Sequence, residues 1–255
     1  MNAAEIEALL TSRLIGRSLR VYEEVTSTND LAIQEGRNGA PEGLVIFAEA
    51  QMKGRGRLGR AWQTDGGKSL AFSILLRPTW TQVSRISLVA AVAVTEALQP
   101  LTTFPVGIKW PNDIYLGGRK IAGILCEAGS DFIVIGIGIN VLQQEHDFDQ
   151  TLSRRAGSIA MFSHPSVDRT HLAAAVLNRF DKIYADLPEA FDHVIDACER
   201  RSVLLGKHVR IAFGQGDVAG VVTGLDRSGA LKVRDDSENE MVIHAGEVTF
   251  LEVPG

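Results

Sequence analysis

The sequence is poor in the residues that build covalent frameworks and metal sites. It contains two cysteines, Cys126 and Cys198, which are not spaced as a CxxC pair. A disulfide framework and a cysteine-built zinc site are therefore not indicated. The six histidines are scattered and show no HxxxH or HExxH spacing, so a dedicated histidine-built metal site is not expected either.

An excess of positive charge and long apolar runs are also lacking. Lys plus Arg is 26 against 31 Asp plus Glu, a net charge of -5, so the chain as a whole is not built to coat nucleic acid or an anionic membrane. The longest apolar helical stretch, around residues 88–94, is far shorter than the roughly 20 residues that span a bilayer. No signal-peptide pattern opens the chain, and we expect a cytoplasmic protein.

The 45% of hydrophobic residues among 255 is enough for a buried core, and their spacing predicts alternating strands and helices. A helix is expected to begin after Ser27, with Asp30 as a capping acid. Further helices are expected over residues 6–14, 83–98, 169–186 and 189–200, and strands over 19–25, 44–48, 70–76, 121–127 and 132–140.

Beyond Ser202 the helical periodicity disappears. Short alternating stretches follow, separated by glycine-containing and acidic turns, at residues 208–213, 218–225, 230–233, 241–244 and 248–253. This pattern predicts a small all-β barrel of the SH3-like kind. We therefore expect two domains, residues 1–201 and residues 202–255.

A basic, glycine-rich stretch at residues 53–60 reads KGRGRLGR and has no acid in its own sequence to pair with its four cations. Such a cluster predicts an anionic ligand, although a solvated loop or a nonspecific RNA contact remains open from charge alone. Its three glycines satisfy GxGxxG, but the following AWQTDGG cannot open the helix that a dinucleotide site needs. The P-loop pattern and the kinase HRD and DFG signatures are absent. Arginine forks, which bind phosphate or carboxylate bidentately, are the expected anion ligands.

A second polar cluster lies within the apolar stretch VGIKWPNDIYLGGRKIAGILCE at residues 106–127. Lys109 stands beside Trp110, where desolvation is costly unless an anion offsets it. Asp113 could be that anion in a structural salt bridge. Equally, a carboxylate with the neighbouring amide of Asn112 suits a phosphate-bound Mg²⁺, so both interpretations stay open at this point.

Four motifs in order allow a more specific interpretation of the sequence. They are TSTND at 26–30, AEAQMKGRGRLGRAW at 48–62, KWPNDIYLGGRKIAGILCE at 109–127 and GIGIN at 136–140. Together they resemble the motifs of biotin protein ligases, from about residue 19 to the C-terminus. The resemblance implies an α+β fold in which a central mixed β-sheet, like that of class II synthetases, forms the catalytic domain before the SH3-like barrel. It also implies a monomer or homodimer that uses ATP and Mg²⁺ to make biotinyl-5'-AMP, then biotinylates a lysine of a biotin carboxyl carrier protein.

The resemblance also implies a role for individual residues. Lys120 and Arg57 are the expected catalytic cations, and Asp113 is the expected Mg²⁺ ligand. The expected biotin contacts are Ser27, Thr28, Asn29, Gln51, Arg55, Gly56, Arg57, Lys120, Gly123 and Leu125. The expected ATP contacts are Arg60, Trp62, Lys109, Asn112 and Asn140. Without the resemblance, Ser27 is equally an N-cap, Trp62 a core residue and Lys120 a solvated hairpin lysine, while Cys126 is expected to be core and not a nucleophile.

Three alternatives to a biotin ligase without a DNA-binding domain are considered. Only 26 residues precede Ser27, so we expect no DNA-binding helix-turn-helix. A lipoate ligase would share the fold and the adenylation chemistry. A non-enzymatic RNA-binding or adaptor protein would need a broader basic face, whereas residues 201–255 hold six Lys or Arg against eight Asp or Glu.

The glycines of the basic stretch generate a first prediction. Residues 53–62 are expected to close over the ligands once an anion neutralises the arginines, which shields a hydrolysable mixed anhydride from water. Hydrogen exchange or limited proteolysis of this segment, with and without biotin plus ATP, measures the closure. Equal protection in both states would rule it out.

Overall fold

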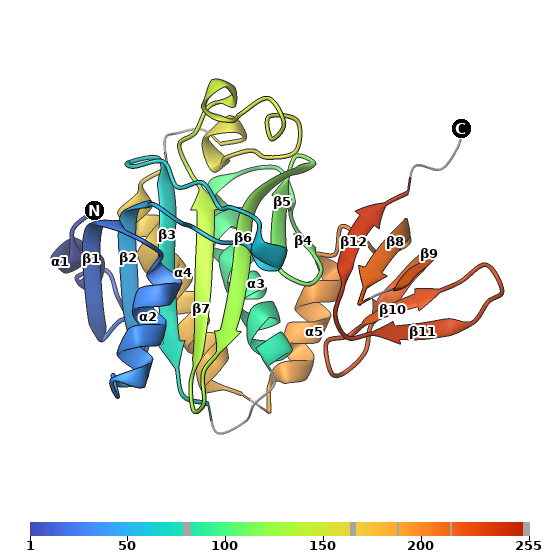
Figure 1. The fold of residues 1–255 in the computed structure, drawn as a ribbon, viewed down its shortest axis with the longest axis horizontal. Coiled ribbons are helices and arrows are strands. Elements are labelled where there is room, and N and C mark those ends of the chain that lie inside the picture. The colour runs from blue at the N-terminus through green and yellow to red at the C-terminus, as the bar shows by residue number, and fades with distance from the viewer. Residues whose placement is uncertain (79–82, 164–166, 188, 215, 252–255) are drawn as a thin grey trace.

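Two β-sheets organise the chain, and helices cover the larger one (Figure 1). The computed structural model describes residues 1–78, 83–163, 167–187, 189–214 and 216–251. The larger sheet has seven strands in the order β1-β2-β3-β7-β6-β5-β4, and the smaller has five in the order β11-β10-β9-β8-β12. The predicted α+β class with two parts is confirmed.

The seven-stranded sheet is mixed, as predicted. Strands β1 and β2 pair in parallel, while the other neighbours pair antiparallel. Its strands are β1 (Ser18–Val25), β2 (Leu44–Gln51), β3 (Ser69–Leu76), β4 (Val106–Lys109), β5 (Asp113–Leu116), β6 (Arg119–Ala128) and β7 (Ile133–Asn140). Every residue of β3 is buried, and β7 is nearly as buried, which explains why both read as short continuous apolar runs in the sequence.

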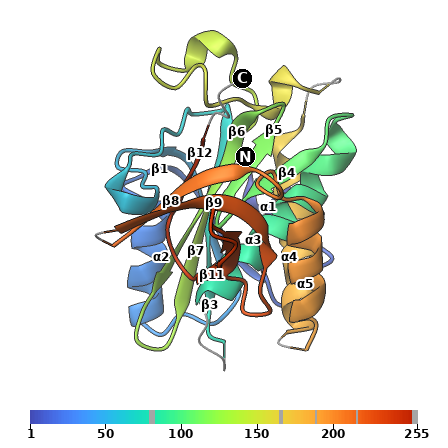
Figure 2. The ribbon, with the colours of Figure 1, turned by 90° about the vertical axis from the view of Figure 1, so that its right-hand side faces the viewer.

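Helices lie on both faces of this sheet (Figure 2). One face carries α3 (Val83–Leu98), α4 (Arg169–Ala185) and α5 (Phe191–Arg200), and the other carries α2 (Thr28–Arg37). The larger apolar core lies under the three helices, and a smaller one, which includes Ala32, Ile46 and Phe132, lies under α2. Single-turn helices occur at η1 (Arg57–Gly59), η2 (Gln99–Leu101), η3 (Glu145–Asp147) and η4 (Ile159–Met161). None of the helices in the described part of the chain combines the length and apolar character that a membrane crossing requires.

The first helix is shorter than predicted. Helix α1 spans Ala3–Glu7, whereas helical spacing extends over residues 6–14. Asp181 of α4 explains the early end, because its carboxylate accepts hydrogen bonds from the backbone N–H groups of Arg13, Leu14 and Ile15 at 2.8 to 2.9 Å. A carboxylate from a distant helix thus satisfies donors that a longer α1 would have bonded internally.

The five-stranded sheet follows directly on α5 and contains β8 (His208–Phe213), β9 (Gly216–Leu225), β10 (Leu231–Arg234), β11 (Glu240–Ile243) and β12 (Glu247–Phe250). All of its pairings are antiparallel, and β11 and β12 stand at its edges. The predicted strands are therefore present, except that residues 252 and 253 lie outside the described residues. Trp110 joins the two sheets, since its Nε1 donates to the Gly229 carbonyl at 2.9 Å.

Glu49 at the end of β2 fixes the chain that returns from the basic loop into β3. Its carboxylate pairs with Arg169 of α4 at 2.8 Å and accepts from the Gly67 N–H at 3.2 Å. Burial alone would raise the pKa of Glu49, but the hydrogen bonds from Arg169 and from the amino terminus outweigh it and lower the pKa from 4.5 to about 2.

This depressed pKa predicts acid sensitivity. The Glu49 carboxylate stabilises the fold by about 3 kcal/mol above its unfolded pKa, and this contribution is lost as the pH falls from 4.5 towards 2. In urea denaturation, Glu49→Gln should therefore lose less free energy of unfolding between pH 6 and pH 3 than the wild type. Glu5→Gln, at an exposed position of α1, is the control. The same pH slope for Glu49→Gln and the wild type would contradict the assignment.

Candidate active site

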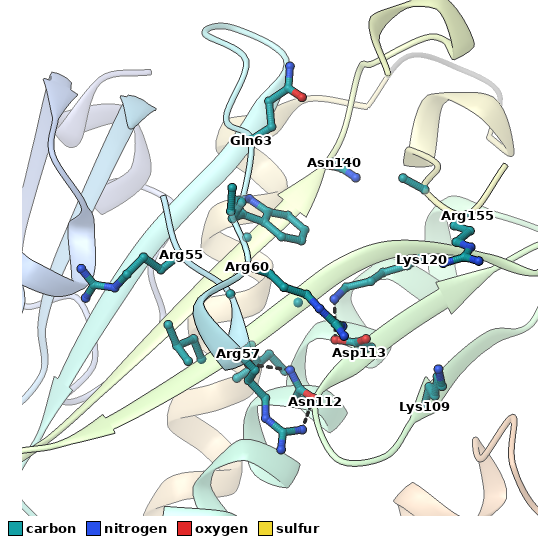
Figure 3. A pocket seen from close by; sticks show the side chains of 18 of the residues that line it. Arg55, Arg57, Arg60, Gln63, Lys109, Asn112, Asp113, Lys120, Asn140 and Arg155 are labelled. Carbon is teal, nitrogen blue, oxygen red and sulfur yellow. Dashed lines mark hydrogen bonds and ion pairs between the residues drawn. The ribbon is translucent and has the colours of Figure 1, made fainter. Parts of the chain in front are cut away.

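A cavity of about 740 Å³ lies between the basic loop, the strands β4 to β7 and the start of β12 (Figure 3). All of the site residues predicted from the sequence line it: Ser27, Thr28, Asn29, Gln51, Arg55, Gly56, Arg57, Arg60, Trp62, Lys109, Asn112, Asp113, Lys120, Gly123, Leu125 and Asn140. Residues more than 100 positions apart in the sequence thus share one cavity. Their roles towards a ligand remain predictions.

One end of the cavity is a buried network of neutral hydrogen bonds at the start of α2. The Thr28 N–H donates to Gln51 Oε1 at 2.8 Å, and Gln51 Nε2 donates to Thr64 Oγ1 at 3.0 Å. From β3, the Ser73 hydroxyl donates to Asn29 Oδ1 at 2.6 Å. Because these bonds fix the buried side chains of Thr28, Asn29 and Ser73 and the half-buried one of Gln51, this end is preorganised to match a polar neutral group.

The predicted capping of α2 is wrong. Ser27 occupies the N-cap position, but its side chain makes no capping hydrogen bond. Asp30 does not cap the helix either; it pairs with Arg55 of the basic loop at 2.6 Å. Ser27 is buried and lines the cavity.

Glycines in the two central strands make room for the side chains above them. A Cβ on Gly136 would collide with the Asn29 amide, and one on Gly138 would collide with the Trp62 indole. A Cβ on Gly123 would lie 3.2 Å from the same indole. Trp62 thus packs onto bare strand backbone, with its Nε1 buried and without a hydrogen-bond partner among the described residues. This close approach needs glycine in β7, and in β6 a Cβ would be a tight contact.

The basic loop folds back on itself as a tight hairpin. Trp62 N–H donates to the Gly54 carbonyl at 2.9 Å, and Gly56 N–H donates to the Arg60 carbonyl at 2.8 Å. The turn between them passes through positive φ at Leu58 (57°) and Gly59 (72°). This geometry sends Arg55 away from the centre of the cavity and Arg57 and Arg60 towards it (Figure 3).

Acids from distant segments reach two of the loop's cations, Arg55 and Arg60. Arg55 binds both oxygens of Asp30, at 2.6 and 2.9 Å, and hydrogen bonding to Asp30 raises the pKa of Arg55. Arg60 forms an ion pair with Glu247 at the start of β12. Sequence distance hid these partners, since Glu247 lies 187 residues from Arg60.

Arg57 is held by neutral acceptors instead. Its Nη1 donates to Asn112 Oδ1 at 3.1 Å and its Nη2 to the Gly246 carbonyl at 3.2 Å. Asn112 is itself fixed, because its Nδ2 donates to the Ile124 carbonyl at 2.9 Å. The Arg57 guanidinium therefore carries a positive charge that neither of these two contacts neutralises, which suits the binding of an anion.

Lys120 and Asp113 form the centre of the cavity. Lys120 Nζ lies 2.6 Å from Asp113 Oδ1 and 5.7 Å from the centre of the Trp62 ring (Figure 3). Lys109 of β4 lies opposite Asp113 of β5 in the strand register. Its Nζ lies 5.3 Å from the centre of the Phe250 ring. Burial lowers the pKa of Lys109, and the Asp113 carboxylate partly offsets this effect. Among the described residues Asp113 thus forms its ion pair with Lys120 and not with Lys109, the partner considered in the sequence analysis.

A resident metal centre is not present in the described part of the chain, where no three His, Cys, Asp or Glu side chains come together. Asp113 shares this cavity with two other carboxylates, Asp65 and Glu247, and forms no metal-binding cluster with them. One carboxylate suffices for a Mg²⁺ that arrives already bound to phosphates, but not for a metal held by protein alone. Cys126 is partly buried and packs against the core, as predicted, and burial raises the pKa of its thiol to about 12.

Several cavity residues were missed by the sequence analysis. Gly136 and Gly138 alternate inside an apolar strand, a signal of close backbone approach that the quoted GIGIN motif already contained. Ser73, a polar residue within a fully buried strand, was a comparable signal. Glu247 and Phe250 carried no signal, because their position depends on how the two sheets pack.

Comparison with known proteins identifies the family. Residues 21–140 match the biotin/lipoate A/B protein ligase family, and residues 204–251 match the biotin protein ligase C terminal domain. The biotin–(acetyl-CoA-carboxylase) ligase of Mycobacterium tuberculosis is 32% identical over 258 residues, which cover 96% of this chain and 95% of the relative. The chain belongs to the biotin protein ligase family.

Other relatives agree. The bifunctional ligase/repressor BirA of Bacillus subtilis is 32% identical over 91% of this chain and 74% of its own length. The solved structure of the biotin protein ligase from Aquifex aeolicus in complex with biotin and ATP superposes with a TM-score of 0.83 at 30% identity, covering 93% of this chain and all of that one. These matches support a biotin ligase over the lipoate ligase and the adaptor protein considered above.

The glycine platform, Gly123 and Gly138 on which Trp62 packs, generates a prediction. Gly138→Ala should push the indole off β7, because its new Cβ collides with the ring. We expect a shifted tryptophan emission spectrum and a biotinylation rate lower by about tenfold or more. Gly216→Ala, where a Cβ meets open space, is the control. Unchanged emission and rate in Gly138→Ala would show that the platform is dispensable.

Proposed function

We propose that this chain activates biotin with ATP to form biotinyl-5'-AMP and then transfers the biotinyl group to a lysine of a biotin carboxyl carrier protein. One observation carries the proposal: a single cavity joins a buried neutral hydrogen-bonding end to a cluster of cations. The neutral end suits the ureido ring of biotin, which offers N–H donors and a carbonyl acceptor. The cations suit a carboxylate and a triphosphate that must meet.

In the first step a biotin carboxylate oxygen attacks the α-phosphorus of ATP, and the bond to the bridging oxygen of pyrophosphate breaks. Negative charge gathers around phosphorus as the two anions approach, so fixed cations lower the barrier. Lys120 is placed for this, because its ammonium carries three donors and lies in the cavity, 2.6 Å from Asp113 Oδ1. These donors can bridge the biotin carboxylate and an α-phosphate oxygen. Arg57 would stabilise the same phosphate.

The nucleotide end of the cavity fits the remaining predictions. Arg60 would bind phosphate oxygens, Trp62 would pack against adenine, and Asn140, which is buried and bonded to the Gly157 carbonyl at 3.0 Å, would bind the nucleotide. Lys109 and Asn112 would serve the phosphates. Asp113 would contact the Mg²⁺ that neutralises them, the one contribution that the ion makes here.

The biotin end has the complementary character. Ser27, Thr28, Asn29 and Gln51 offer hydroxyl and amide groups, and Gly123 and Leu125 supply strand backbone and an apolar wall. Gly56 and Arg55 would close this side from the loop. In the second step the carrier lysine amine attacks the biotinyl carbonyl, AMP leaves, and the amine loses its proton as the amide forms.

The wider setting is also a proposal. We propose a catalytic domain of residues 1–201 and a second domain of residues 202–255. The protein would act in the cytoplasm, where ATP is available and free thiols such as those of Cys126 and Cys198 persist, as a monomer or homodimer. The net charge of -5 favours neither DNA nor an anionic membrane as a partner.

The experiment compares biotin with lipoate in ATP–pyrophosphate exchange and then follows label transfer to a carrier lysine. We expect exchange with biotin only, and Lys120→Gln and Arg57→Gln should each slow it by about a hundredfold or more, since each removes a cation from the transition state. Lys182→Gln, at an exposed site on α4, should retain wild-type rates. A wild-type rate in the Lys120 and Arg57 variants would contradict this mechanism. Exchange with lipoate and not with biotin would show that lipoate is the substrate.

A further inference from the structure

Glu127 lies at the end of β6, just outside the cavity. Side chains alternate along a strand, so Gly123, Leu125 and Glu127 share one face of β6. The first two line the cavity, whereas Glu127 does not. Its side chain is 30% exposed and lies next to the start of α2. Glu127 is thus close to the site without being placed to touch a ligand.

The Glu127 carboxylate joins two parts of the site that the sequence keeps apart. Its Oε2 accepts a hydrogen bond from Asn29 Nδ2 at 2.7 Å. Both of its oxygens also lie 3.3 Å from Arg55 Nη2. One side chain therefore binds the start of α2 and the basic loop at the same time.

Its partner Asn29 is held in one orientation. The Ser73 hydroxyl donates to Asn29 Oδ1 at 2.6 Å, so the amide nitrogen must face β6, where Glu127 and the Leu125 carbonyl (3.3 Å) accept its protons. Asn29 is only 4% exposed, and Gly136 leaves the space that it fills. Without an acceptor at position 127, a buried N–H would lose its better partner.

The other partner, Arg55, is occupied by carboxylates. Two hydrogen bonds from its guanidinium reach Asp30 in bidentate geometry, and a third group of contacts reaches Glu127. A guanidinium held by two carboxylates has little positive charge left for a phosphate. Arg55 therefore serves as an anchor for the loop, whereas Arg57, held by an amide and a carbonyl, keeps its charge for the ligand.

We propose that Glu127 is a positioning residue that fixes the basic loop relative to the buried network at the start of α2. This inference rests on the proposed function, because the distance between these two parts sets how a carboxylate bound at the neutral end meets a phosphate bound by Arg57. A loop displaced by about 1 Å would misalign the two reacting groups. Glu127 holds the loop through its ion pair with Arg55, and it holds the start of α2 through its hydrogen bond with Asn29.

Two substitutions separate these contacts. Glu127→Gln keeps an oxygen that can accept from Asn29 but removes the charge that pairs with Arg55, whereas Glu127→Ala removes both. We expect Glu127→Gln to raise the KM for ATP about fivefold with little change in the KM for biotin, and Glu127→Ala to raise both, biotin by about tenfold. Thermal midpoints of Glu127→Gln and wild type should agree. Glu23→Gln, at an exposed position of β1, is the control.

A double-substitution cycle tests whether Glu127 acts through Arg55. If it does, Arg55→Gln and Glu127→Gln raise the KM for ATP by similar factors, and the double variant is no worse than either. Independent, multiplying effects would overturn the inference, as would unchanged KM values in both Glu127 variants of an active enzyme.

Hydrogen exchange gives a readout that does not need activity. Amides of residues 53–62 should exchange several-fold faster in Glu127→Gln than in the wild type or the Glu23→Gln control, because one anchor of the loop is lost. Equal exchange would contradict the role of Glu127 whatever the enzyme does. A wild type that shows no biotin-dependent pyrophosphate exchange would instead contradict the proposed function.

Discussion

The site depends on carboxylates that come from distant parts of the chain and hold a cluster of cations in place. Cations gathered in one cavity repel one another, and the repulsion grows as water is excluded. Asp30 of α2, Glu127 of β6, Asp113 of β5 and Glu247 of β12 each bring a negative charge to one of them. The loop can therefore hold Arg55 and Arg60 before any ligand contributes charge, because carboxylates from three elements, α2, β6 and β12, contact it.

These pairs differ in how easily a ligand can replace the protein partner. The Arg60 side chain is 66% exposed, so its ion pair with Glu247 contributes little to stability, and a phosphate can displace the carboxylate at small cost. Arg55 is held by two carboxylates at once and is harder to free. The protein therefore holds the loop firmly at Arg55, whereas at Arg60 a ligand can replace the protein's carboxylate. This difference suits a loop that keeps its position next to the proposed biotin end while its Arg60 side chain adjusts to a nucleotide.

Much of this site could be predicted from the sequence, because the motifs place their polar residues within or next to strands whose apolar patterns are clear. What could not be predicted depends on packing across the chain. The early end of α1 follows from Asp181, more than 165 residues away. The Asp30 carboxylate, expected to cap α2, instead pairs with Arg55. Glu127 stood inside a quoted motif, yet only the fold reveals that it faces both Asn29 and Arg55.

The second sheet completes the cavity, and this links the two domains to the chemistry. Gly246 and Glu247, at the start of β12, bind Arg57 and Arg60, while Phe250 lies beside Lys109. Arg57 and Arg60 of the basic loop thus touch a segment that the chain reaches only after α5 and β8 to β11. A change in how the smaller sheet docks would move the acceptors of Arg57 and Arg60 together. Nucleotide binding and domain docking must therefore influence one another, because any difference in docking free energy between the bound and free states appears equally in the affinity for the nucleotide.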